Sequence, residues 1–174
     1  MIFAIVGPSG AGKDTLIAGA MRARPDLHLV RRVITRPTEA GGEAFDGVTA
    51  AEFAQRKARG DFALDWQAHG LCYAIPKAEL AGAGDIIFNG SRQALALARA
   101  TFPGLRVILI TAPDTVLATR LALRGRETMP DIAQRLARAG YTLPAGIAAV
   151  TISNDGAVAD GIAALIAALQ PVRA

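Results

Sequence analysis

The stretch GPSGAGKD, Gly7 to Asp14, follows an apolar run at 2–6 and precedes a segment with helical periodicity. Its spacing, G-x-x-x-x-G-K between a strand and a helix, is that of a P-loop, a turn that binds phosphate. Its glycines let consecutive backbone N–H groups converge on an anion, and the helix N-terminus adds the positive end of its dipole. The stretch therefore predicts a binding site for a nucleoside triphosphate.

We expect ATP to occupy this turn as phosphoryl donor. Lys13 is expected to reach the β- and γ-phosphates and to act in catalysis. A glycine-rich turn without a ligand is the alternative interpretation. The expected ATP-binding residues of the turn are Gly7, Pro8, Ser9, Gly10, Ala11, Gly12, Lys13, Asp14 and Thr15.

Asp14 stands where this motif usually has a Ser or Thr whose hydroxyl binds magnesium. Like charges about 4 Å apart repel by several kcal/mol at intermediate dielectric, so a carboxylate beside a triphosphate needs a cation between them. We therefore predict that Asp14 binds Mg²⁺ directly or through water, with Thr15 as the alternative ligand. In such proteins an Asp at the end of a buried strand usually also holds Mg²⁺, but this chain has Asn89 at that position. The carboxylate at Asp14 is compatible with a replacement for the one that is missing at position 89. Alternatively, Asp14 only caps the helix.

Short apolar runs alternate with helical patterns along the chain. This alternation predicts an α/β fold of three layers with a mainly parallel five-stranded sheet. The strands are nearly continuous in apolar character, which is typical of a sheet covered on both faces. The expected strands are 2–6, 29–34, 85–89, 105–111 and 147–153. The expected helices are 14–23, 50–59, 92–101, 115–124, 131–139 and 157–169.

Three segments interrupt the alternation. Residues 35–47 are polar and glycine-rich, and predict a long functional loop. Residues 62–74 predict a small hairpin that turns at His69-Gly70. Residues 124–130 combine charge with a proline between two expected helices, and are typical of a mobile lid. A capping box, Thr49 with Glu52, marks the start of the helix that follows the first loop.

The chain has 174 residues, of which 52% are hydrophobic and 20% are charged. This composition suits one packed domain and excludes a disordered chain or a disulfide-rich miniprotein. Only Lys13, Lys57 and Lys77 among the 19 basic residues are lysines. The excess of arginine suits bidentate binding of phosphate, although a general codon preference explains the ratio equally well.

The single cysteine, Cys72, cannot form a disulfide within the chain, which favours a reducing compartment. The apolar run at 2–6 lacks the features of a signal peptide, and 162–169 is too short to span a bilayer. We therefore expect a cytoplasmic protein without a membrane partner. The pI is near 9.8, but no basic run is interleaved with aromatic residues, so no nucleic-acid partner is expected. A homodimer is an alternative to a monomer.

Four motifs together resemble the guanylate kinase-like family of P-loop kinases. They are GPSGAGKD, ITRPTEAGGE at 34–43, DWQAHGLCYAIP at 65–76 and RLALRGRET at 120–128, in the family's order. The resemblance covers most of the chain and implies the fold of a nucleoside-monophosphate kinase in a single domain, 1–174. It also implies a core at 1–34 and 85–174, an acceptor-binding insertion at about 35–84 and a lid at about 124–138.

The acceptor region departs from the pattern of guanylate kinases. Those enzymes have two arginines in the loop before a Gly-Glu pair, whereas this chain has only Arg36. They place a Glu and a small hydroxyl residue against guanine, where this chain has Leu64-Asp65 and Ile75. A guanine in such a site would leave polar edges unpaired, which selects against it. Conversion of GMP to GDP is therefore the alternative function.

The motifs GKD at 12–14, WQAHG at 66–70, NGSR at 89–92 and RGRE at 124–127 are instead similar to those of ribose 1,5-bisphosphate phosphokinases. This resemblance implies ATP-dependent conversion of ribose 1,5-bisphosphate to 5-phosphoribosyl 1-diphosphate in phosphonate catabolism. An acceptor with two phosphates and no base needs cationic anchors rather than base-reading groups. A non-catalytic guanylate kinase-like interaction module is a further alternative, but such modules typically lose the P-loop residues that this chain retains.

The resemblance also implies roles for individual residues. The acceptor phosphate is already ionised at neutral pH, so no general base is expected. For Tyr73, the alternative to binding the acceptor is that its side chain only packs in the hairpin. For Asn154, the alternative to a position near adenine is that it only forms a turn and caps a helix. The expected catalytic residues are Lys13, Arg120, Arg124 and Arg135; the expected acceptor ligands are Arg36, Glu43, Tyr73, Ser91 and Arg92; and Asn154 is expected near the adenine of ATP.

Overall fold

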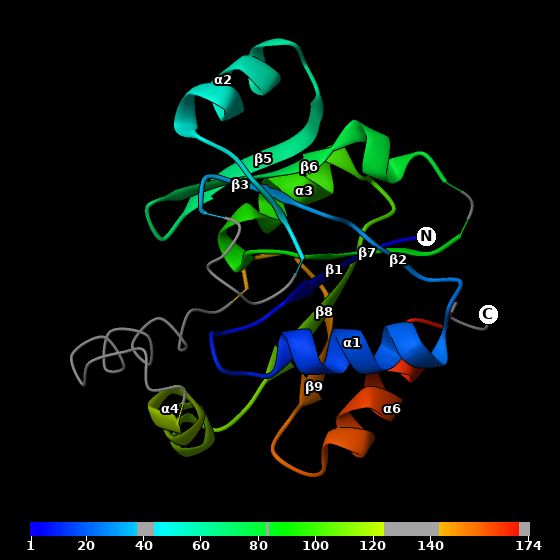
Figure 1. The fold of residues 1–174 in the computed structure, drawn as a ribbon. Helices are drawn as coiled ribbons and strands as arrows, with labels where there is room; N and C mark the ends of the chain where they lie inside the picture. Colours follow the sequence, from blue (N-terminus) through cyan, green and yellow to red (C-terminus); the bar gives the residue numbers. More distant parts are fainter. Residues whose placement is uncertain (38–43, 83, 124–142, 171–174) are drawn as a thin grey trace.

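The computed structural model describes residues 1–37, 44–82, 84–123 and 143–170. Within these residues, a five-stranded parallel sheet has the strand order β2-β7-β1-β8-β9 (Figure 1). The predicted mainly parallel sheet is confirmed. Its strands are β1 (Ile2–Val6), β2 (His28–Leu29), β7 (Ile86–Asn89), β8 (Arg106–Thr111) and β9 (Ala149–Ser153).

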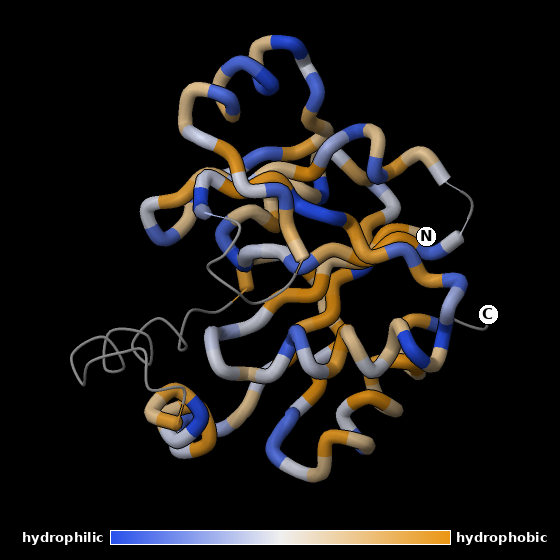
Figure 2. Tube along the Cα trace, viewed as in Figure 1, coloured by the Kyte–Doolittle hydropathy of each residue, from blue (hydrophilic) through white to orange (hydrophobic). Residues whose placement is uncertain are grey.

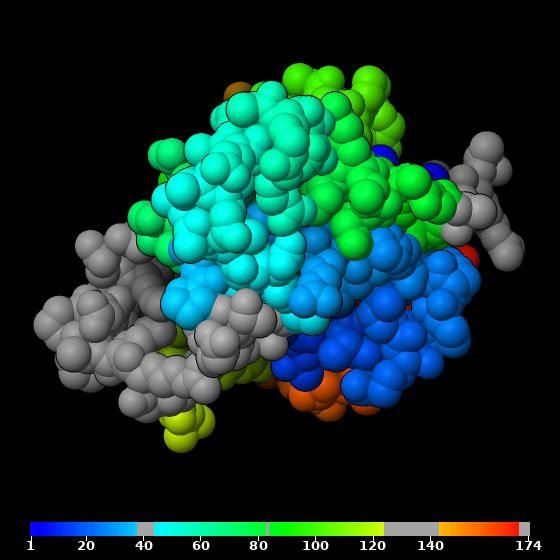
Figure 3. Space-filling model, turned by 45° about the horizontal axis from the view of Figure 1, so that its top comes forward, coloured from blue at the N-terminus to red at the C-terminus, as the bar shows by residue number. Residues whose placement is uncertain are grey.

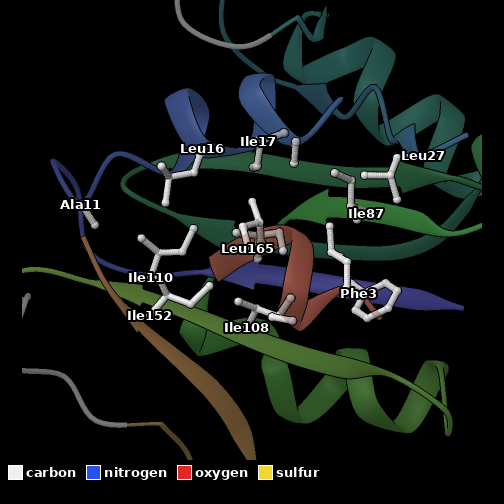
Figure 4. Close-up of a cluster of buried hydrophobic side chains, with 14 of the residues drawn as sticks. Phe3, Ala11, Leu16, Ile17, Leu27, Ile87, Ile108, Ile110, Ile152 and Leu165 are labelled. Atoms are coloured by element: carbon white, nitrogen blue, oxygen red, sulfur yellow. The ribbon is translucent and has the colours of Figure 1, made fainter. Parts of the chain in front are cut away.

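Helices cover both faces of this sheet, as continuous apolar strands require. Phe3 of β1 faces a core shared with α1 (Lys13–Ala23) and α6 (Val158–Ala168) (Figure 4). Ile5 of the same strand belongs to this cluster as well. Ala4 and Val6 face the other way and pack with Leu95 of α3 (Leu95–Thr101). The core strands are mostly hydrophobic along their length (Figure 2). A further helix, α4 (Asp114–Leu123), follows β8.

The insertion forms a second, smaller sheet with the strand order β4-β3-β6-β5. Its strands are β3 (Val33–Ile34), β4 (Asp46–Gly47), β5 (Phe62–Ala68) and β6 (Leu71–Pro76), and the helix α2 (Ala50–Ala58) packs on it through Phe53. Leu64 and Trp66 of β5 belong to the core cluster around α3, so the insertion packs against the core. Figure 3 shows the insertion, cyan to green, directly against the blue N-terminal segments.

Local signals in the insertion predict its structure well. The expected hairpin is present, and its turn residues His69 and Gly70 have φ of 54° and 74°, as a two-residue turn of type I′ needs. The capping box is also confirmed: Thr49 Oγ1 accepts from the Glu52 amide at 3.2 Å, and the Thr49 amide donates to Glu52 Oε2 at 2.8 Å.

The prediction of one strand at 29–34 is wrong, because the chain changes sheets within it. Residues of β2 pair with β7 in the core sheet, whereas Val33 and Ile34 pair with β6 in the insertion. Arg31 and Arg32 lie at the change, and two adjacent cations do not suit a sheet that is covered on both faces. The predicted loop at 35–47 likewise ends in β4, which pairs with β3.

Two further differences concern helices. The expected helix at 92–101 begins as the 3₁₀ turn η3 (Arg92–Ala94) before α3, and a second 3₁₀ turn, η2 (Lys77–Leu80), follows β6. The expected helix at 131–139 and the expected lid lie outside the described residues. No helix among the described residues is both long enough and apolar enough to cross a bilayer.

Candidate active site

The P-loop joins the end of β1 to α1 at the carboxyl edge of the core sheet (Figure 1). Two of its glycines lie where no side chain fits. A Cβ atom at Gly7 would be 2.0 Å from the carbonyl oxygen of Ile110, and one at Gly12 would be 2.4 Å from Nδ2 of Asn154. Gly12 has a left-handed φ of 88°, and no described side chain caps the helix that starts after it. The first amides of α1 can therefore serve an anion.

Lys13 is the first residue of α1, and its ammonium group folds back over the loop. Nζ donates to the carbonyl oxygens of Gly7 at 2.9 Å and Pro8 at 3.0 Å. These contacts hold the positive charge beside the turn where the motif places the phosphates of a triphosphate. The structure thus brings Lys13 and the predicted phosphate-binding backbone together.

Asp14 and Asn89 meet at the carboxyl end of β7. Asn89 is buried, and its Nδ2 donates to Oδ1 of Asp14 at 3.1 Å across 75 residues of sequence. Asp14 and its neighbour Thr15 are exposed in the first turn of α1. Mg²⁺ is commonly held by one or two protein oxygens together with water and substrate phosphates, so this oxygen-rich corner suits Mg²⁺. The described residues contain no cluster of three or more side chains of the kinds that form all-protein metal sites.

Asn154 supports the P-loop from inside the protein. Its Nδ2 donates to the Ala11 carbonyl oxygen at 2.7 Å, and its backbone N–H donates to the Thr111 carbonyl oxygen at 2.7 Å. The side chain is 5% exposed. These bonds give Asn154 a role in positioning the loop, and its predicted contact with adenine stays a prediction.

Arg120 of α4 lies close to the P-loop. Its Nη1 is buried and has no hydrogen-bond partner among the described residues, and it lies 3.9 Å from where a Cβ at Gly12 would be. A buried guanidinium donor without a partner is costly unless a ligand completes it. The position fits the predicted contact of Arg120 with phosphate. Arg124 and Arg135, the other expected catalytic arginines, lie outside the described residues.

On the acceptor side, Arg36 lies two residues after the end of β3. Its guanidinium carbon is 4.4 Å from the centroid of the Phe45 ring, so the two planar groups pack against each other. Ser91 and Arg92 follow β7, as predicted, and Ser91 Oγ accepts from the Gln93 amide at 3.3 Å to cap η3. Glu43, another expected acceptor ligand, lies outside the described residues.

Tyr73 packs on Trp66 across the hairpin. Their ring centroids are 5.5 Å apart and the planes differ by 7°, and the two residues are paired in the β5–β6 register. The packing alternative therefore describes the observed contact. The role of Tyr73 as an acceptor ligand stays a prediction.

Sequence reasoning missed Arg32, which is only 8% exposed. Its guanidinium carbon lies 5.3 Å from the Tyr73 ring centroid and 5.9 Å from that of Trp66. Asp14 and Arg36 are among the charged groups that act on it. The signal was present in the sequence: two arginines interrupt a run that otherwise reads as a buried apolar strand.

Comparisons with known proteins show the family to which the chain belongs. A protein of Agrobacterium fabrum named ribose 1,5-bisphosphate phosphokinase PhnN is 46% identical over 172 residues, covering 95% of this chain and 94% of that protein. A bifunctional ribose 1,5-bisphosphokinase-thymidine phosphorylase of Cupriavidus necator is also 46% identical over 172 residues, covering 97% of this chain. This chain spans only 29% of the length of the bifunctional protein. No family model matches the chain.

The solved structures show the fold. A guanylate kinase from Anaplasma phagocytophilum superposes with a TM-score of 0.70 and 15% identity, covering 97% of this chain and 84% of that chain. At this identity the likeness concerns the fold and not the acceptor. The predicted guanylate kinase-like P-loop fold is therefore confirmed.

Proposed function

The chain belongs to the ribose 1,5-bisphosphate phosphokinase family, and from this premise we propose that it transfers the γ-phosphoryl group of ATP to ribose 1,5-bisphosphate. The product is 5-phosphoribosyl 1-diphosphate, formed in phosphonate catabolism. The observation that carries the proposal is the position of Lys13, held over an intact P-loop while Arg120 approaches the same loop from α4. The acceptor side contributes Arg36 and Arg92, and it has Leu64-Asp65 and Ile75 where a guanine site has base-reading groups.

In the proposed reaction an oxygen of the acceptor's 1-phosphate attacks the γ-phosphorus of ATP. A new P–O bond forms as the bond to the β,γ-bridging oxygen breaks, and ADP leaves. The attacking oxygen is ionised at neutral pH, so no side chain has to remove a proton. Lys13, the first amides of α1 and Arg120 hold the donor and neutralise the charge that the transferring group carries. Arg124 and Arg135 belong to the same proposal.

Magnesium completes the proposed donor site. When bound, Mg²⁺ neutralises charge on the β- and γ-phosphates. We propose that Asp14 holds it directly or through water, with Thr15 as the alternative. Asn89 would then orient the Asp14 carboxylate through their hydrogen bond, as groups behind metal ligands commonly do.

The acceptor is tested by offering ribose 1,5-bisphosphate and GMP in separate ADP-release assays, with products identified by ³¹P NMR. We expect kcat/KM for ribose 1,5-bisphosphate to exceed that for GMP by at least about 100-fold, because a site that lacks partners for a polar base rejects it strongly. Assays without acceptor measure hydrolysis of ATP as the control. Turnover of GMP alone would replace this function by that of a guanylate kinase.

The metal site is tested with Asp14→Asn. We expect the Mg²⁺ concentration that gives half-maximal rate to rise about 10- to 100-fold, in the range found when groups around a metal are changed. Binding of Mn²⁺ together with ATP, followed by electron paramagnetic resonance, should weaken in parallel. Asp114→Asn is the matched control, because Asp114 lies in the first turn of another helix, α4. An unchanged Mg²⁺ requirement in Asp14→Asn would remove this carboxylate from the metal site.

A further inference from the structure

Arg32 is a buried cation, and the proposed mechanism assigns it no role. It lies between β2 and β3, where the chain passes from the core sheet to the insertion, and it is 8% exposed. The stacked rings of Trp66 and Tyr73 lie beside its guanidinium group, at 5.9 and 5.3 Å from ring centroid to guanidinium carbon. Because a cation packed on aromatic faces loses freedom to swing, this side chain presents a fixed donor group.

The charges around Arg32 connect it to both halves of the site. Burial lowers the pKa of Arg32 to about 10, while Tyr73 and Asp14 oppose this shift and Arg36 adds to it. The group therefore remains a cation at neutral pH. Asp14 belongs to the P-loop helix and Arg36 to the acceptor side, so Arg32 lies within electrostatic range of both. The Arg32 and Arg36 guanidinium groups repel each other, and an anion that binds to both would stabilise them.

We propose that Arg32 binds the 5-phosphate of ribose 1,5-bisphosphate and thereby selects a bisphosphorylated sugar over a nucleoside monophosphate. This inference rests on the proposed function. The planar fork of arginine binds two phosphate oxygens at once, which suits a rigid anchor. In a nucleoside monophosphate a neutral base takes the place of this second phosphate, and it cannot accept the pair of charge-assisted hydrogen bonds that the guanidinium group offers to a phosphate.

Arg32 is assigned to the 5-phosphate, and not to the 1-phosphate, because the reacting end of the acceptor lies elsewhere in the site. The 1-phosphate must approach the γ-phosphate at Lys13, and it changes its bonding during the reaction. Arg32 instead packs on Trp66 and Tyr73, the hairpin of the insertion. A part of the substrate that does not react can bind tightly to a fixed group, and its binding energy then orients the reacting end.

Two sugar monophosphates separate the phosphates experimentally. Ribose 5-phosphate and ribose 1-phosphate are used as competitive inhibitors against ribose 1,5-bisphosphate, for the wild type and Arg32→Met. We expect Arg32→Met to raise KM for ribose 1,5-bisphosphate and Ki for ribose 5-phosphate by about 10- to 100-fold, the usual effect of removing a hydrogen bond between charged groups. Ki for ribose 1-phosphate and KM for ATP should change by less than about threefold, since neither contacts Arg32 in this proposal.

Two further variants control the result. Arg31→Met removes the neighbouring arginine, whose side chain is exposed, and should behave as the wild type. Arg32→Lys keeps the charge without the planar fork, and should show the same selective loss at a smaller size, about tenfold. If Arg32→Met does not fold, Arg32→Lys carries the test. Melting temperatures of all variants are measured alongside.

The outcomes distinguish this inference from the proposed function. Equal changes for both inhibitors, or no change for either, would show that Arg32 only stabilises the insertion, and would overturn the inference while the function stands. If the wild type phosphorylates GMP and not ribose 1,5-bisphosphate, the function fails first and the inference fails with it. A selective rise for ribose 5-phosphate supports both.

Discussion

Replacement of Lys13 by alanine should lower kcat by about 10³-fold, the effect typical of removing a charged group that stabilises a transition state in a preorganised site. The ammonium group lies beside the P-loop, where it would contact the β- and γ-phosphates throughout the transfer. The fold should persist, because the two hydrogen bonds that Nζ donates to the carbonyl oxygens of Gly7 and Pro8 come from a partly buried group and are worth about 1 kcal/mol each. Rates are measured by coupled ADP release, and stability by thermal unfolding.

The matched control for this variant is Lys77→Ala. Lys77 is exposed in η2, which follows the hairpin of β5 and β6. Its replacement by alanine removes the same charge as Lys13→Ala. We expect this control to retain activity within about twofold of the wild type, as surface substitutions generally do. Activity of Lys13→Ala within a few-fold of the wild type, at unchanged stability, would be incompatible with the proposed donor site.

Replacement of Gly7 by alanine should destabilise the protein by about 3 kcal/mol, at the upper end of the usual effect of overpacking, and should abolish ATP binding. The added Cβ would lie 2.0 Å from the Ile110 carbonyl oxygen. That oxygen belongs to β8, which pairs with β1 on one side and β9 on the other, so it cannot retreat easily. The P-loop must move instead, and its amides then no longer converge. Thermal unfolding and titration calorimetry with ATP measure the two effects.

Gly82→Ala is the control for this substitution. No described heavy atom beyond its chain neighbours lies within 4 Å of the position where a Cβ at Gly82 would be. We expect this control to change stability by less than about 0.5 kcal/mol. If Gly7→Ala matches the wild type in melting temperature and ATP affinity, the close approach of the loop to β8 is not a requirement of the site.

Much of the fold was predictable because its signals are local. The first strand was predicted with the bounds that it has in the structure, and the capping box at Thr49 and the hairpin turn at His69-Gly70 are both present. Each of these signals acts between residues a few positions apart. The P-loop itself is local in the same sense, because its spacing encodes both the turn and the helix start.

The errors and omissions arise where residues distant in sequence meet. The strand expected at 29–34 is divided because its first half pairs with β7 and its second half with β6. No local pattern shows that Arg32 packs on the rings of Trp66 and Tyr73, because apolar periodicity does not indicate which distant residues a side chain contacts. The support of the loop by Asn154 joins residues 143 positions apart.

The amino-acid pattern alone was enough to predict the parallel α/β core and the P-loop that the structure shows, because backbone propensity, periodicity and motif spacing all act over one or two turns of chain. The cation-rich acceptor region stays a prediction. Only the folded molecule places Asp14 against Asn89, Arg120 beside Gly12, and Arg32 against the rings of Trp66 and Tyr73. Such contacts depend on strand order and on which helix covers which face. These follow from packing the whole core at once, and no single segment encodes them.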